Sequence, residues 1–397
     1  MYYVDHTKPP FIDISLPPAI TLPVTLLVSL YAGVLGLDFY LLRHERLFRK
    51  VISPTQLRIA MAIVHAVIPL VFVCNRPPFN VFFAGAPWLL ATYTAAIPTE
   101  NLTMEKWVRT LMQVTIVQRP EGVDDRKIRY KGIAKISLAI FKLVFMHLFV
   151  DSLLPRHIEY VLEYSWIHPV GIFYTFLFGL KAYCLLGVID LLMGVEQTLF
   201  AWNMIDLFNS PIIASSPRDF WSRRWNKVVR NLLHSQIFKS TKEPGPENKP
   251  AQKMKETSNN RRVTRSLAAA SKAVAETKNV IHDVTVTHVH PKRSSSFWTT
   301  ASGRGLLAFI VSGTFHEVII MSVCRKITLE NFVFFMLQGL AVMMEVKLRQ
   351  GAWKQEPIGM TRVWCIGAQL LFMSITGRLF IAPFLRCQSF LESARFF

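Results

Sequence analysis

The sequence has few cysteines and lacks the short motifs of several large enzyme classes. Its five cysteines are scattered, without CxxC spacing, so neither a disulfide framework nor a zinc site is expected, and packing is their simplest role. GxSxG, P-loop and GxGxxG motifs are missing, which argues against the hydrolase and nucleotide-binding classes that carry them. His316 and Glu317 begin an HExxH-like pattern, but its fifth position is Ile320. A zinc metalloprotease is therefore excluded.

Charged residues are also scarce, at 18% of the chain against 51% hydrophobic residues, with 29 phenylalanines. Such a composition is too apolar for one globular core and predicts a protein embedded in a bilayer. Residues 1–18 are polar and Pro-rich and have no basic n-region, so the first apolar run is expected to be a retained span rather than a signal peptide. The net charge of +19 lies in loops, and no nucleic-acid-binding fold accompanies it, so we expect no nucleic-acid partner.

Apolar runs of about 20 residues predict an all-α, polytopic transmembrane helical bundle of about eight spans. The predicted spans are 19–42, 55–74, 79–98, 133–153, 167–200, 305–323, 329–345 and 361–385. The run 167–200 is long for one crossing, so it is either one tilted helix or two helices that meet near Gly179 or Gly187.

Basic loops between the spans predict the orientation, because Lys and Arg concentrate on the cytoplasmic side. With eight spans the segment 1–18 is lumenal, although the short loop with Arg325 and Lys326 then lies on the unexpected side. The transmembrane core comprises residues 19–239 and 299–397. Between them, 240–298 is rich in Pro, Lys, Glu and Asn and predicts a disordered, basic, cytosolic insertion.

Residues 217–235 predict an amphipathic helix at the cytosolic membrane surface. Ser216 and Pro217 are typical of a helix start. At 100° per residue Trp221 and Trp225 lie on one face with the aliphatic residues, while Arg223 and Arg224 lie on the other. The arginines can anchor lipid headgroups or attract the phosphates of coenzyme A.

Two polar residues are candidates for chemistry. Asn226 lies at the edge of the apolar face, where it is either a boundary residue bonded to a neighbouring backbone group or a functional carboxamide. His316 lies mid-span on a helix face that it shares with Ser312 and Gly313, and an ionisable group at that depth is a functional candidate. His65 and His147, also in predicted spans, have no motif around them and are expected to be buried structural residues.

The segments RDFWSRRWN and SGTFHE together resemble the wax-synthase branch of the membrane-bound O-acyltransferase family. Phe220, Trp221, Trp225 and Asn226 match the FYxxWWN box of sterol and diacylglycerol acyltransferases. The resemblance covers about residues 170–390 and departs from the family in the long gap from Asn226 to His316. Proteins with such an insertion look most like fungal acetyltransferases of terpenoid pathways.

The resemblance implies catalysis by His316 and Asn226, with no bound cofactor or metal. Neutral imidazole can take a hydroxyl proton, and a carboxamide N–H can bind an oxyanion. We expect Trp221, Arg223, Arg224, Trp225 and Ser312 to bind substrate. The expected reaction is transfer of an acetyl group from acetyl-CoA to a lipophilic terpenoid alcohol, in a multi-pass protein of the endoplasmic reticulum.

Two alternatives remain open at this stage. One is a wax-ester synthase that uses a long-chain acyl-CoA and a fatty alcohol. The other is a transporter with Lys181, Asp190, Glu196 and His316 along its path, although no internal repeat supports it. The sequence does not determine the oligomeric state.

Overall fold

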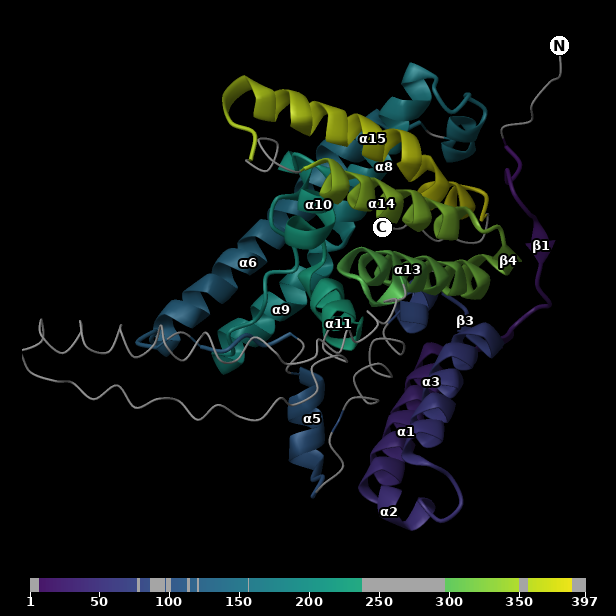
Figure 1. Cartoon of the computed structure of the whole chain (residues 1–397), viewed down its shortest axis with the longest axis vertical. Coiled ribbons are helices and arrows are strands. Elements are labelled where there is room, and N and C mark those ends of the chain that lie inside the picture. The colour runs from purple at the N-terminus through teal and green to yellow at the C-terminus, as the bar shows by residue number, and fades with distance from the viewer. Residues whose placement is uncertain are drawn as a thin grey trace, which may run out of the picture.

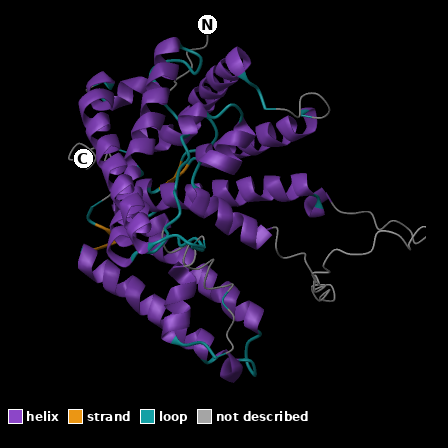
Figure 2. Cartoon of the chain, turned by 90° about the vertical axis from the view of Figure 1, so that its left-hand side faces the viewer, coloured by secondary structure: helices purple, strands orange, loops and turns teal. Residues whose placement is uncertain are grey.

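The computed structural model describes residues 7–76, 79–85, 97, 101–112, 115–119, 121–155, 157–237, 297–349 and 356–387. This part of the chain is mostly helical, with four short strands (Figure 2). Its longer helices are α1 (Val24–Arg43), α3 (Pro54–Val71), α5 (Met104–Met112), α6 (Asp125–Phe145), α8 (Pro169–Leu185), α9 (Gly187–Phe200), α11 (Lys227–Ile237), α13 (Ala301–Cys324), α14 (Glu330–Leu348) and α15 (Gly359–Leu385). Shorter helical pieces are α2 (Glu45–Phe48), η1 (Met146–Val150), α7 (Asp151–Leu153), η2 (Ile158–Leu162), η3 (Pro211–Ile213), α10 (Pro217–Asp219), η4 (Phe220–Arg224) and η6 (Phe297–Thr299).

Seven helical segments among the described residues are long and apolar enough to cross a membrane. They are Val24–Arg43, Pro54–Val71, Asp125–Leu153, Pro169–Phe200, Ala301–Cys324, Glu330–Leu348 and Gly359–Leu385. Each overlaps a predicted span, which confirms the polytopic helical class. The remaining predicted span, 79–98, is described only at residues 79–85 and 97. The predicted insertion 240–298 lies outside the described residues except for its last two.

The long apolar run 167–200 forms two helices, α8 and α9, that meet at Leu186. The junction is therefore at Gly187, one of the two positions that the sequence suggests. A Cβ on Gly187 would lie 3.3 Å from Cδ of Lys142, so glycine lets α6 approach closely here. Nζ of Lys142 forms a buried ion pair with Asp190 at 3.1 Å. A buried charge needs such a partner, and this pair joins α6 to α9.

The histidines of the other spans differ in environment. His65 on α3 is 1% exposed, and its Nε2 lies 2.6 Å from Oδ2 of Asp38 on α1. The predicted structural role of a buried, hydrogen-bonded His65 is thus confirmed. His147 has a side chain that is 76% exposed, 3.8 Å from Asp151. The prediction that His147 is buried was wrong, because η1 turns it away from the neighbouring helices.

Helices α13, α14 and α15 pack side by side and form the C-terminal part of the bundle (Figure 1). Two glycines allow α13 and α14 to approach closely. A Cβ on Gly313 would lie 3.1 Å from Cα of Phe332, and one on Gly339 would lie 2.9 Å from Cβ of Phe309. Gly313 on the His316 side of α13 therefore serves helix packing, as small residues do between spans.

The N-terminal segment is fastened to the end of α13. Strand β1 (Ile14–Ser15) pairs antiparallel with β4 (Lys326–Ile327), and β2 (Ile20–Leu22) pairs parallel with β3 (Phe72–Cys74) (Figure 1). Arg325 donates to the carbonyl of Leu70 at 2.8 Å and Lys326 donates to Asp13 at 2.8 Å. Arg325 and Lys326 therefore join the end of α13 to the N-terminal segment and to α3. This structural role accounts for two basic residues in a loop that is predicted to be lumenal. The orientation itself stays a prediction.

Candidate active site

The segment 217–235 is not the continuous amphipathic helix that its periodicity predicts. Ser216 accepts from the N–H of Asp219 at 3.1 Å, so the predicted start of the helix is confirmed. A π-helical turn, η4, follows, and the N–H of Trp225 bonds to the carbonyl of Phe220 at 2.9 Å. Trp225 is extended and Asn226 has a φ of +32°, so the chain bends before α11 starts. The prediction of one continuous helix was wrong, because the spacing of apolar residues does not indicate a residue with a positive φ.

Trp221, which precedes the bend, packs against α13 and α14. Its indole Nε1 donates to Oε1 of Gln338 on α14 at 3.0 Å. Its ring meets Phe309 and Phe335 edge-on or tilted, with centroids 5.7 and 5.6 Å away. Trp225 stacks on Phe220 at 5.2 Å. Both tryptophans are therefore partly buried and pack against other aromatic rings, so we call them wall residues.

The two predicted arginines have different environments. Nε of Arg224 bonds to Oδ2 of Asp219 at 2.7 Å, and both side chains are mostly buried. Arg224 therefore stabilises the bend. Arg223 is exposed and pairs with Glu356, and this ion pair holds the pKa of the Glu356 carboxyl below its ordinary value. Of the two, only Arg223 faces solvent.

More cations surround Arg223. Arg218, Arg223 and Arg349 line a small cavity of about 20 Å³ together with Ser215, Asp219 and Glu356. Guanidinium groups bind phosphate oxygens well, in bidentate geometry. The site thus has a polar face of three arginines and two carboxylates beside the aromatic wall.

Asn226 serves as the N-cap of α11. Its Oδ1 accepts from the N–H of Val229 at 3.2 Å, which is the boundary role that the sequence left open. A left-handed φ suits asparagine better than most residues. The Nδ2 group has no hydrogen-bond partner within the described part of the chain. The carboxamide is half-buried, so its N–H groups are available to a ligand.

His316 lies midway along α13, with its ring held at one nitrogen. Nδ1 donates to the backbone carbonyl of Ser312 at 2.8 Å. Since a carbonyl can only accept, the proton of the neutral ring is on Nδ1, and Nε2 carries the free lone pair. Nε2 has no partner among the described residues. Ser312 touches His316 through its backbone, so a role of its hydroxyl in substrate binding stays a prediction.

Aromatic rings enclose the His316 imidazole. Phe335 of α14 lies 4.4 Å from it between centroids, Phe315 lies at 5.3 Å and Phe380 of α15 lies at 5.4 Å. Sequence reasoning missed Phe335 and Phe380, because nothing local distinguishes them among 29 phenylalanines. Their presence makes the surroundings of the basic nitrogen apolar.

Glu317 points to the neighbouring helix, as expected from its position 100° around α13. Its Oε1 accepts from the backbone N–H groups of Asn331 at 3.0 Å and Phe332 at 3.3 Å. These are among the unpaired donors at the start of α14. Glu317 therefore joins α13 to the start of α14.

The fold brings the two motifs to one aromatic wall, although 90 positions separate Asn226 from His316. The wall runs from His316 to Phe335 at 4.4 Å, then to Trp221 at 5.6 Å and to Trp225 at 6.5 Å. Asn226 follows Trp225, and α11 also packs on α13. No hydrogen bond joins His316 to Asn226 in the described residues, and the rings of Phe335, Trp221 and Trp225 link the two positions.

Gln338 is a further site residue that the sequence did not reveal. It is 0% exposed, accepts from Trp221 and donates to Oγ1 of Thr376 at 2.9 Å. We expect Gln338→Leu to lower the free energy of unfolding by about 1–3 kcal/mol, because it leaves the indole N–H and the threonine hydroxyl without this partner.

The matched control is Gln369→Leu. Gln369 is also buried, but both polar atoms of its side chain lack partners among the described residues. Its replacement should be neutral or stabilising. Thermal unfolding of the two variants in the same detergent distinguishes them, and equal losses would contradict a specific role for Gln338.

The segment that contains the bend is also the one that matches a known protein family. Residues 202–269 match the sequence model of the membrane bound O-acyl transferase family. The match covers a small part of the chain. It contains the bend from Trp221 to Asn226, whereas His316 lies beyond the matched residues.

Individual relatives agree with the family match. The chain is 27% identical over 199 residues to the Arabidopsis thaliana protein named probable long-chain-alcohol O-fatty-acyltransferase 1, an alignment that covers 49% of this chain and 43% of the relative. It is 26% identical over 204 residues to number 9 of the same series, with 49% and 45% covered. Number 2 is 28% identical over 180 residues, with 45% and 38% covered. The acyltransferase similarity thus spans less than half the length of these relatives.

Proposed function

We propose that this protein transfers a fatty acyl group from acyl-CoA to the hydroxyl of a long-chain alcohol within a membrane. The observation that carries the proposal is His316, whose Nδ1 is held by the Ser312 carbonyl while Nε2 stays free inside an aromatic enclosure. The aromatic wall links this base to the segment that matches an acyltransferase family. The relatives named above are long-chain-alcohol O-fatty-acyltransferases, which favours a fatty alcohol over a terpenoid acceptor.

The proposed step uses the chain's own groups. The alcohol proton moves to Nε2 of His316 as the alcohol oxygen bonds to the thioester carbonyl carbon. The carbonyl oxygen becomes negative and is stabilised by an N–H of Asn226. The C–S bond then breaks, and the CoA thiolate leaves with the proton from the imidazolium. The tautomer set by Ser312 has its lone pair on the atom that must take the proton.

The surroundings of the site suit two unlike substrates. A fatty alcohol can reach the Phe335 and Phe380 rings from lipid, while the polar part of CoA requires water and cations. Arg218, Arg223 and Arg349 supply those cations near the bend. The basic loops favour the cytosolic side of the membrane as the side from which CoA enters. We propose that this membrane is the endoplasmic reticulum.

The transporter alternative loses support from the ion pairs. Lys181 bonds to Asp151 at 2.8 Å and Asp190 to Lys142 at 3.1 Å, so these charges join helices. They do not form an unpaired polar path.

The test is an ester assay on membranes that contain the protein. Palmitoyl-CoA or acetyl-CoA is supplied with hexadecanol or with a terpenoid alcohol, and esters are identified by mass. We expect hexadecyl palmitate as the main product, formed at least about a hundredfold more slowly by membranes with His316→Gln. Terpenyl acetate as the main product would instead support the acetyltransferase predicted from resemblance. Absence of any ester and of CoA release would refute the acyltransferase proposal.

A further inference from the structure

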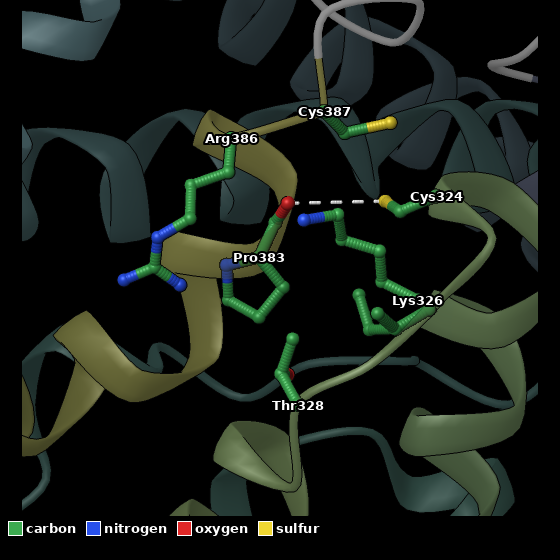
Figure 3. A pocket seen from close by; sticks show the side chains of 7 residues that line it. Cys324, Lys326, Thr328, Pro383, Arg386 and Cys387 are labelled. Atoms are coloured by element: carbon green, nitrogen blue, oxygen red, sulfur yellow. Dashed lines mark hydrogen bonds between the residues drawn. The ribbon is translucent and has the colours of Figure 1, made fainter. Parts of the chain in front are cut away.

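A cavity of about 190 Å³ lies where the ends of α13 and α15 meet, away from the bend at Asn226 (Figure 3). It is lined by Ile320, Cys324, Lys326, Thr328, Pro383, Arg386 and Cys387. Its two cysteines come from different helices, because Cys324 ends α13 and Cys387 follows α15. Nothing in the proposed acyl transfer uses either thiol.

The two thiols reach across to each other's helix. Sγ of Cys324 donates to the carbonyl of Pro383 at 3.8 Å, and Sγ of Cys387 donates to the carbonyl of Val323 at 3.9 Å. Figure 3 shows both side chains on the same side of the cavity, above Pro383. Each thiol therefore lies against the helix end that carries the other cysteine.

Charged contacts keep the two helix ends in place. Nη1 of Arg386 bonds to Oε2 of Glu330 at 2.5 Å, and Lys326 bonds to Asp13. Arg325 bonds to the carbonyls of Pro17 and Leu70. The ends of α13 and α15 are therefore tied to the N-terminal segment and to α14, so the thiols meet in a braced structure.

This end of the bundle is the one that we predict to face the lumen, with residues 1–18. Disulfides form and persist in oxidising compartments such as the lumen of the endoplasmic reticulum. The scattered cysteines of the sequence gave no sign of pairing, since Cys324 and Cys387 are far apart along the chain. Only the packing of α13 against α15 brings them together.

We propose that Cys324 and Cys387 form a disulfide bond that fastens α13 to α15. The two thiols lose two protons and two electrons and form one S–S bond. The electrons and protons pass to a small-molecule disulfide, such as oxidised glutathione, which is reduced to two thiols. The bond closes a loop that contains α14 and α15. It thereby joins the helix that carries His316 to the helix whose Phe380 contacts the His316 ring.

Counting free thiols tests the proposal. Membranes are lysed in excess maleimide, the protein is denatured, and labelled cysteines are counted by mass before and after reduction. The chain has five cysteines, so we expect three labels before reduction and five after it. A peptide that links Cys324 to Cys387 should be found without reductant. Five labels before reduction would overturn the proposal.

Two single variants identify the pair. In Cys324→Ser all four remaining cysteines should be labelled without reductant, because Cys387 loses its partner. In Cys365→Ser, a matched change on α15, only two should be labelled. Four labels in Cys365→Ser would contradict the assignment. Reductant should also lower the unfolding temperature of the wild type by several degrees and leave that of Cys324→Ser unchanged.

Discussion

Replacement of His316 by glutamine is expected to lower the rate of ester formation by about 10²- to 10⁴-fold, the usual contribution of a general base. Glutamine has similar bulk and can keep a bond to the Ser312 carbonyl, but its amide cannot accept the alcohol proton near neutral pH. The Phe335 and Phe380 rings should keep their packing. The measurement is the initial rate of ester formation with saturating acyl-CoA and alcohol, at equal amounts of inserted protein.

The control for this change is His147→Ala. His147 also belongs to an apolar span, but its side chain is 76% exposed and lies 3.8 Å from Asp151. Its removal should leave the rate within about twofold of the wild type, since nothing in the reaction uses it. If His316→Gln retained near wild-type turnover, His316 would be a packing residue, and the proposed base would have to be sought elsewhere.

Asn226→Asp is expected to lower the rate by about 10²- to 10³-fold, the usual cost of removing an oxyanion donor. The substitution separates two roles that the structure combines in one side chain. An aspartate oxygen can still accept from the N–H of Val229, and aspartate also tolerates the left-handed φ of +32°. The amide N–H groups, however, are lost. Folding should therefore be retained while catalysis fails.

Asn231→Asp is the matched control for charge. Asn231 lies on the exposed side of α11 beside Arg230, so the variant adds the same negative charge to the same helix. It should keep nearly full activity. A purely structural Asn226 predicts near wild-type rates in Asn226→Asp as well, so equal activity of the two variants would remove Asn226 from the catalytic set. Thermal unfolding of both proteins checks that the cap is intact.

Local information predicted the spans well. A run of about 20 apolar residues can satisfy its backbone only as a helix when the bilayer surrounds it, so composition alone sets where such helices lie. The Ser216 cap and the break at Gly187 are also local, since each depends on the conformational preferences of a few neighbouring residues. The role of Glu317 could be derived because 100° per residue determines which way it points.

The path of the chain at Trp225 and Asn226 could not be predicted in the same way. The spacing of apolar residues in 217–235 suits one helix. A π-helical turn followed by a residue with positive φ changes the direction in which every later side chain points. Long-range contacts stabilise this bend: Trp221 bonds to Gln338, and Arg224 bonds to the carbonyls of Asn209 and Ser210. No local preference indicates those partners.

The sequence by itself determined that the chain forms a polytopic helical bundle, and it identified His316 and Asn226 as the polar residues to examine. The physical reason is that hydrophobic run length and an ionisable group in an apolar span are local properties. Only the tertiary structure decided which nitrogen of His316 is free, that Asn226 caps a helix, and that Cys324 and Cys387 each contact the other's helix end. These depend on contacts between residues far apart in the chain, which form only when close helix packing brings their side chains together.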